Sequence, residues 1–192
     1  SYQRTMLKRI FDIIFSLGVL LIFALPILVI SAAIRITSKG PAIYWSDRIG
    51  KDNIIFRMPK FRTMQIDTPA VATHLMTDPD KYITRVGKFL RKTSLDELPQ
   101  IWSILVGDMS VVGPRPALFN QDDLVRLRTA AGVEKLPPGL TGWAQINGRD
   151  ELPIPEKVKL DAEYLEQKSF LFDLKIIFLT FARVLHRQGV AH

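Results

Sequence analysis

An almost continuously apolar stretch from residue 10 to residue 36 constrains this chain more than any other feature. As one straight helix its 27 residues would reach about 40 Å, whereas the hydrocarbon core of a bilayer is about 30 Å thick. Pro26 falls near the middle, where it removes a backbone hydrogen bond and clashes with the carbonyl of Ile22. The sequence therefore predicts a kinked helix whose halves are each too short to span a membrane.

Basic residues flank this stretch on both sides, Lys8 and Arg9 before it and Arg35 and Lys39 after it. Because cytoplasmic segments are enriched in Lys and Arg, both ends are expected on the cytoplasmic side. A re-entrant hairpin broken at the proline satisfies both observations. A spanning anchor stays open, since many spanning helices tolerate a proline kink. A cleaved signal peptide is disfavoured because the run is too long, although residues 31–33 resemble a cleavage site. Membrane association in some form is therefore expected.

The remaining composition points to an anionic partner. The chain of 192 residues suits one domain and carries a formal charge of +7, with 26 Lys and Arg against 19 Asp and Glu. Nucleic acid, anionic lipid and a phosphorylated substrate are the candidate partners. The chain contains no cysteine, which excludes a disulfide framework and thiolate metal ligands. Its three histidines lack metal-ligand spacing, so zinc chemistry is not expected.

Short elements are predicted in the middle of the chain. Apolar runs at residues 43–45 and 54–56 predict a strand pair, and the cations that follow in Lys60-Phe61-Arg62-Thr63-Met64 are typical of a solvated strand face. Residues 83–92 predict a short amphipathic helix with basic residues at its end, and residues 98–106 predict a second helix capped by Gly107.

Asp96 and Glu97 are adjacent carboxylates at the expected start of this second helix. Ser94 with Glu97 three residues later matches a capping box, and the helix dipole favours acids in a first turn. On this stretch alone the capping interpretation is favoured over a catalytic pair. Beside the preceding basic run, the same residues would instead suit a phosphate site, because backbone N–H groups at a helix start bind anions.

Two rigid loops each present an arginine. Arg115 lies between Pro114 and Pro116, and residues 137–149 interleave turn residues with Trp143 and Arg149. Further on, residues 156–168 have helical periodicity. Residues 170–187 are apolar around most of a helix, which is typical either of core packing or of a membrane interface.

Five motifs, in order over nearly the whole chain, resemble the bacterial sugar transferase family. They are Lys60-Phe61-Arg62-Thr63-Met64, Ser94-Leu95-Asp96-Glu97-Leu98-Pro99-Gln100, Gly107-Asp108-Met109-Ser110, Val112-Gly113-Pro114-Arg115-Pro116 and Pro138-Gly139-Leu140-Thr141-Gly142-Trp143-Ala144-Gln145-Ile146-Asn147-Gly148-Arg149. Members of this family are monotopic polyprenyl-phosphate phosphoglycosyl transferases. Motifs of this length are highly specific as a set, so the resemblance favours the catalytic interpretation of Asp96 and Glu97.

The resemblance implies transfer of a sugar 1-phosphate from a UDP-sugar to undecaprenyl phosphate, with release of UMP, at the cytoplasmic face of the bacterial inner membrane. This reaction begins the assembly of surface glycans. Asp96 is expected to attack the sugar-bearing phosphorus and to hold the phosphosugar until the lipid phosphate displaces it; a carboxylate can form such an intermediate. Glu97, with Asp96, is expected to bind a Mg²⁺ cofactor that offsets diphosphate charge.

The expected substrate-binding residues are mainly cations, since positioning and charge neutralisation carry most of phosphoryl transfer. The set is Lys60, Arg62, Arg91, Arg115, Arg149 and Asp161. Trp143 is expected near the uridine or, equally, in the core or the membrane interface.

The resemblance also sets the expected architecture, which is α+β and mainly helical. A broken, re-entrant membrane helix is expected over residues 1–38, and a small cytoplasmic α/β catalytic domain with amphipathic interfacial helices over residues 39–192. Leu25 precedes Pro26 where relatives often have Ser, and residues 46–50 lack the usual glutamine, so Arg48 is given no role. Many relatives carry further membrane helices ahead of this unit, so we expect a minimal family member or a piece of a longer chain.

Two other classes of function fit part of the sequence. A non-catalytic basic module that binds anionic lipid or nucleic acid explains the charge and the apolar helix, but neither the rigid arginine loops nor the paired carboxylates. A metal-dependent UDP-sugar pyrophosphatase would use the same carboxylates with water. Under the family interpretation the partners are the UDP-sugar, undecaprenyl phosphate and membrane lipid, and no nucleic acid is expected.

Overall fold

The computed structural model describes residues 2–69, 77–148 and 152–189. The fold is α+β and mainly helical, as the sequence predicts. The helices are α1 (Tyr2–Thr37), α2 (Arg85–Thr93), α3 (Gln100–Val106), α4 (Asp122–Ala130), α5 (Trp143–Asn147), α6 (Ile154–Gln167) and α7 (Phe170–Gly189). The strands are β1 (Ile43–Ile49), β2 (Ile55–Phe61), β3 (Ser110–Val112) and β4 (Gly139–Thr141), and short 3₁₀ helices are η1 (Lys51–Asn53), η3 (Pro79–Lys81), η4 (Leu95–Glu97) and η5 (Val133–Lys135).

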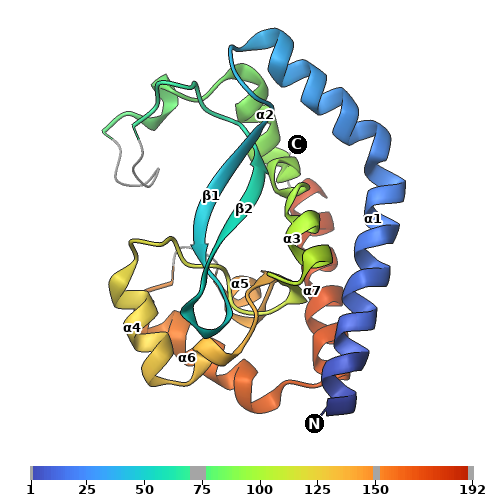
Figure 1. The fold of residues 1–192 in the computed structure, drawn as a ribbon, viewed down its shortest axis with the longest axis vertical. Coiled ribbons are helices and arrows are strands. Elements are labelled where there is room, and N and C mark those ends of the chain that lie inside the picture. The colour runs from blue at the N-terminus through green and yellow to red at the C-terminus, as the bar shows by residue number, and fades with distance from the viewer. Residues whose placement is uncertain (1, 70–76, 149–151, 190–192) are drawn as a thin grey trace.

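Helix α1 runs along one side of the molecule and bends towards α2 in its upper part (Figure 1). It continues through Pro26 rather than breaking into two helices. A proline removes only its own N–H donor, so the hydrogen bonds on either side can hold the helix together through a bend. Of the described helices, it is the one long and apolar enough to cross a membrane, from Thr5 to Thr37, and little of it is buried. These properties indicate membrane association.

The two halves of α1 pack on different parts of the molecule. Before the proline, Phe11 and Phe15 pack against the largest core cluster. After it, Ile34 is buried with Phe61 of β2 and Leu90 of α2. The opposite side of α1 exposes apolar residues to the surroundings, with Leu21, Ile22, Leu25 and Leu28 among them.

Polar contacts also fasten the first half of α1. Asp12 accepts hydrogen bonds from Ser110 Oγ (2.7 Å) and from the Val111 N–H (3.0 Å), both in β3. Lys8 Nζ donates to the Val112 carbonyl (3.0 Å) and pairs with Asp173 of α7. A buried carboxylate or ammonium needs such partners, because without them its desolvation is costly. This half of α1 is therefore part of the folded body.

The predicted strand pair is confirmed as an antiparallel hairpin. The register runs from Ile43 opposite Phe61 to Ile49 opposite Ile55. Because side chains alternate along a strand, Phe56, Met58 and Lys60 share one face, and this face packs towards the core. The hairpin occupies the middle of the molecule, with α3 between it and α1 (Figure 1).

Strands β3 and β4 pair in parallel, with Ser110 opposite Gly139 and Val112 opposite Thr141. Their backbones pack so closely at Gly139 that a Cβ atom there would lie 2.0 Å from the Gly113 nitrogen. Only glycine allows this approach. The contact brings the loop after β3 against the loop before β4, although the two are far apart in the sequence.

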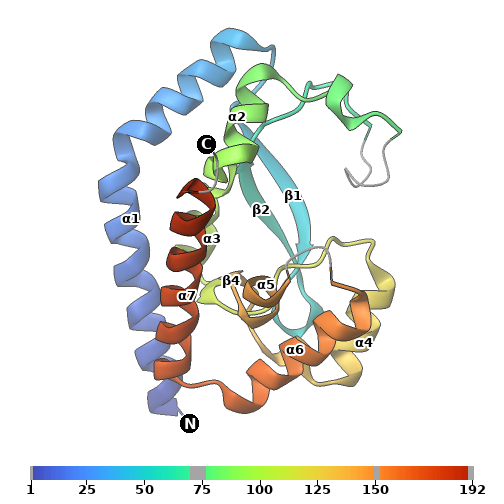
Figure 2. The same cartoon turned by 180° about the vertical axis from the view of Figure 1, so that it is seen from behind.

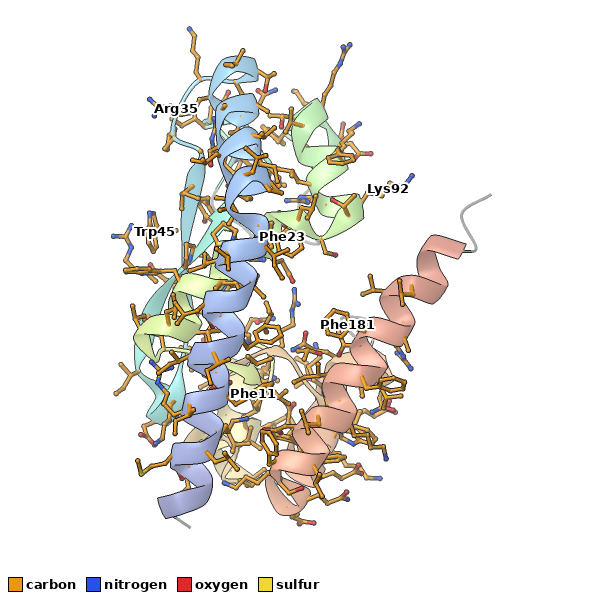
Figure 3. The ribbon with its side chains drawn as sticks, turned by 90° about the vertical axis from the view of Figure 1, so that its right-hand side faces the viewer. Phe11, Phe23, Arg35, Trp45, Lys92 and Phe181 are labelled. Carbon is orange, nitrogen blue, oxygen red and sulfur yellow. The ribbon has the colours of Figure 1, made fainter. Side chains whose placement is uncertain are left out.

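Helix α7 lies beside the lower half of α1 (Figure 2). Phe170 meets Phe11 edge to face, with ring centroids 5.6 Å apart, and Ile176 is fully buried. Figure 3 shows the two helices separating above Phe11, and Phe181 is exposed. The two alternatives left open by the sequence therefore describe different sides of one helix, since one side packs in the core and the other presents apolar side chains.

Candidate active site

The carboxylate pair lies on η4, directly after a reversal of the chain at Ser94. Helix α2 ends at Thr93, and Ser94 has the left-handed backbone conformation (φ 59°, ψ 17°). Its N–H donates to the Arg91 carbonyl and its carbonyl accepts from the Glu97 N–H, both at 3.3 Å. The predicted capping box is wrong, because the Ser94 side chain makes no cap hydrogen bond. Backbone contacts replace it, since Ser94 closes α2 instead of opening α3.

Helix α2 is fixed against the end of β2. Thr84 caps its N-terminus by accepting a hydrogen bond from the Gly87 N–H (2.9 Å). At Gly87 a Cβ atom would lie 2.0 Å from the Thr63 carbonyl oxygen, so the helix backbone touches the chain just beyond β2. Arg91 Nε donates to Thr63 Oγ1 (3.0 Å). These contacts hold Arg91, and η4 after it, beside Lys60 of β2.

A small hollow opens next to η4. It is lined by Arg48, Met58, Lys60, Glu97, Gln100, Arg115, Pro116, Gly139 and Leu140. Glu97 Oε1 lies 3.8 Å from Lys60 Nζ and 3.8 Å from Arg115 Nη1. The structure thus brings together Lys60, Glu97 and Arg115 from three of the sequence motifs.

Asp96 sits half-buried beside this group. Burial, reinforced by the negative charge of Glu97, raises the pKa of Asp96, and Lys60 and Arg91 oppose that shift. Burial lowers the pKa of Lys60, and the charge of Glu97 opposes it. With Arg48 and Arg115, the cations around the two carboxylates leave an excess of positive charge, which suits a ligand with several negative charges.

Arg62 and Asp161 lie away from the hollow. Arg62 is buried, and its guanidinium donates to the Pro41 carbonyl (2.7 Å) and to Ser38 Oγ (2.9 Å), which closes the end of α1. Asp161 is 1% exposed and pairs with Arg128. Arg149 lies outside the described residues. The solvated strand face predicted around Lys60 and Arg62 is wrong, because both side chains are largely buried.

Sequence reasoning missed Arg48 and Gln100. Arg48 donates to the Pro116 carbonyl (3.1 Å) and lines the hollow. The alternation of the hairpin was a usable signal, since in its register Arg48 shares a face with Lys60. Gln100 is only 4% exposed and also lines the hollow. It lies inside a quoted motif, but nothing in the local pattern separates it from a surface residue.

The donor atoms present fit a magnesium ion that arrives with a phosphorylated ligand. Within residues 2–69, 77–148 and 152–189, no group of three His, Cys, Asp or Glu side chains could form a metal cage. Mg²⁺ commonly takes one or two carboxylates and completes its shell with phosphate oxygens and water. Asp96 and Glu97 supply such a pair at the edge of the hollow.

Comparison with known proteins gives a consistent result over almost the whole chain. Residues 3–187 match the model of the family described as "Bacterial sugar transferase". The chain is 40% identical over 182 residues to the UDP-glucose:undecaprenyl-phosphate glucose-1-phosphate transferase of Escherichia coli (strain K12), which covers 91% of this chain and 39% of that protein. It is 37% identical over 199 residues to the undecaprenyl-phosphate galactose phosphotransferase of Salmonella typhimurium, covering 95% and 41%.

A shorter relative is matched nearly end to end. The uncharacterized sugar transferase EpsL of Bacillus subtilis (strain 168) is 38% identical over 185 residues, which is 96% of this chain and 90% of that protein. The chain spans about two fifths of the longer relatives, so the matched region is the part that the longer and shorter proteins share.

Proposed function

The chain belongs to the bacterial sugar transferase family, and we propose that it transfers a sugar 1-phosphate from a UDP-sugar to undecaprenyl phosphate, with release of UMP. The match over residues 3–187 supports this activity, as do the substrates printed in the names of the relatives. The observation that carries the proposal is the position of Glu97 at 3.8 Å from both Lys60 and Arg115, next to Asp96. Such an arrangement suits a diphosphate at the hollow.

Asp96 acts as the nucleophile. Its carboxylate oxygen attacks the phosphorus that carries the sugar and forms a new P–O bond, while the bond from that phosphorus to the oxygen of UMP breaks. A phosphate oxygen of undecaprenyl phosphate then attacks the same phosphorus, and the bond to Asp96 breaks. The products are UMP and a lipid diphosphate sugar, and Asp96 returns to its ionised form.

The cations hold the diphosphate in line for both steps. Lys60 and Arg91 oppose the rise in the pKa of Asp96, so they favour the ionised carboxylate that attacks the phosphorus. Lys60 and Arg115 lie on either side of Glu97 in the hollow, where they would bind phosphate oxygens. Neutralisation of this kind carries most of the catalysis in phosphoryl transfer.

Glu97 and Asp96 would hold the Mg²⁺ ion together with the diphosphate. When bound, the ion offsets negative charge on the departing UMP.

Residues 1–38 form a re-entrant membrane segment, and residues 39–192 a catalytic domain at the cytoplasmic face of the bacterial inner membrane. The bend of α1 supports this arrangement, and so does its outward apolar side, where Leu21 is 82% exposed. The absence of cysteine allows a clean test with single-cysteine variants at Thr5 and Lys39. Neither variant should react with a periplasmic maleimide reagent in intact cells, and reaction of one alone would exclude the re-entrant topology.

The activity is tested by UMP release from a panel of UDP-sugars with undecaprenyl phosphate in detergent or lipid nanodiscs. Asp96→Asn should lower the rate by at least about three orders of magnitude, since loss of a covalent nucleophile is among the largest single losses in enzymes. The matched control is Asp123→Asn, an exposed carboxylate on α4. Full activity in Asp96→Asn would remove the nucleophile assignment, and many turnovers without lipid acceptor would favour a pyrophosphatase.

A further inference from the structure

The loop that carries Arg115 is fixed from outside by a buried ion pair. We infer that Arg128 is a positioning residue for Arg115, and that Asp161 acts through Arg128 without touching the substrate. The inference rests on the proposed function, because Arg115 matters only if the hollow binds a diphosphate.

The guanidinium of Arg128 bridges two parts of the molecule. Its Nη1 donates to the main-chain carbonyl of Arg115 (2.7 Å). Its Nε and Nη2 lie 2.9 and 2.8 Å from Asp161 Oδ2 on α6. Arg128 is 8% exposed, so both contacts are made away from bulk water. One planar side chain on α4 thus joins α6 to the backbone of the residue whose side chain reaches Glu97.

The loop needs this support because it cannot support itself. Pro114 and Pro116 have no N–H to donate, so the loop is barred from a regular hydrogen-bond ladder. The carbonyls from the end of β3 through the loop are met from elsewhere: that of Val112 by Lys8, that of Pro114 by the Gly139 N–H, and that of Pro116 by Arg48. Arg128 meets the carbonyl at the centre of this series, on Arg115 itself.

The chemistry of Asp161 fits an indirect role better than contact with substrate. A carboxylate placed against a diphosphate would repel it. Asp161 instead faces Arg128; it is 1% exposed and does not line the hollow. A buried ion pair is a weak source of stability, because desolvation offsets the attraction. Here the ion pair holds the Arg128 guanidinium in one orientation. In that orientation the guanidinium holds the Arg115 carbonyl, and with it the Arg115 backbone, in place.

The discriminating measurement is a double-mutant cycle on kcat/KM for the UDP-sugar, made with the full chain in one detergent or nanodisc preparation. Arg128→Lys keeps the charge but loses the planar fork that makes both contacts at once. A displacement of about 1 Å in a substrate-binding group can cost about 100-fold in rate, so a loss of roughly tenfold to a hundredfold is expected. The matched control is Arg126→Lys, the same change at an exposed position on α4, which should keep full activity.

The cycle pairs Arg128→Lys with Arg115→Met. If Arg128 acts by positioning Arg115, Arg128→Lys should cost almost nothing in a protein that already carries Arg115→Met. Losses that multiply in the double variant would overturn the inference and make Arg128 an ordinary structural residue. If Arg128→Lys fails to fold, Asp161→Asn replaces it in the cycle, because the asparagine keeps an acceptor oxygen for Arg128. It too should cost almost nothing in the presence of Arg115→Met, and losses that multiply would overturn the inference. No turnover by the unsubstituted protein with any UDP-sugar would instead mean failure of the proposed function.

Discussion

Gly87 lets α2 pack directly against the chain beyond β2, because it has no side chain, and this packing positions the candidate nucleophile. A Cβ atom at this residue would lie 2.0 Å from the Thr63 carbonyl oxygen, whereas ordinary van der Waals contact begins at 3.4 Å. The Thr63 carbonyl is also held by the Thr84 N–H (3.0 Å), so it cannot simply turn away. Gly87→Ala therefore has to move α2 by about 1 Å or more from the end of β2.

The cost of this movement can be set against the gain in helix propensity. Overpacking of this kind costs about 1–3 kcal/mol. The Arg91–Thr63 hydrogen bond would also be lost, at about 1 kcal/mol. Alanine in place of glycine returns about 1 kcal/mol in a helix interior. The net loss is about 1–3 kcal/mol, which lowers the unfolding midpoint by roughly 2–12 °C in a chain of this size.

Activity should fall further than stability. Helix α2 carries Arg91 and leads through Ser94 into Asp96, so the shift moves both relative to Lys60. A misplacement of about 1 Å costs about 100-fold in rate. The assay is UMP release at a temperature well below the unfolding midpoint, with the midpoint followed by tryptophan fluorescence.

Gly18→Ala is the matched control, since this glycine also lies inside a helix and its Cβ would meet nothing within 4 Å. It should leave activity unchanged and raise the midpoint slightly or not at all. If Gly87→Ala behaved like Gly18→Ala in both measurements, the close contact of α2 with Thr63 could not be what positions the site.

Further predictions concern Asp96, beside the hollow, and Gln100, which lines it. Burial raises the pKa of Asp96 above 3.8, so the acid limb of kcat/KM should lie above that pH. A raised pKa means that the ionised form of Asp96 destabilises the fold, so Asp96→Asn should raise the free energy of unfolding at pH 7. This gain in stability should vanish as the pH falls below 3.8, where the carboxyl is protonated in both the folded and the unfolded protein. An Asp96→Asn variant that is no more stable than the unsubstituted protein at pH 7 would contradict the burial argument. Gln100→Ala should lower kcat/KM about tenfold, through loss of one hydrogen bond to the substrate. Gln100→Glu should lower kcat/KM further, because the new carboxylate repels the diphosphate. A fully active Gln100→Glu variant would show that Gln100 does not contact the substrate.

Local signals predicted most of the elements. The helix closed by Gly107 and the alternating hairpin follow from residues within a few positions of each other, and the structure has both, with Gly107 in the left-handed conformation (φ 99°). The capping box failed although it is equally local. Ser94 could open one helix or close another, and the packing of α2 on Thr63 selects the second.

The cations of one motif show why the site could be predicted only in part. Lys60 and Arg62 are two residues apart and look equivalent in the sequence. Lys60 reaches Glu97, while Arg62 closes the end of α1 through Ser38 and Pro41. Strand β2 ends at Phe61, so the alternation that would place both cations on one face no longer applies to Arg62.

The basic residues at the start of α1 also have contacts that the sequence could not predict. Lys8 and Arg9 predicted a cytoplasmic flank because cations beside an apolar run usually face lipid headgroups and water. In the structure Arg9 donates to the Ile104 and Leu105 carbonyls at the end of α3, and Lys8 is held by Val112 and Asp173. Their partners lie about 100 or more residues away along the chain, beyond the reach of any window on the sequence. The charge of Lys8 and Arg9 is thus accounted for by the fold, whichever side of a membrane they occupy. Evidence for a re-entrant path must therefore come from Pro26, the bend and the outward apolar side of α1.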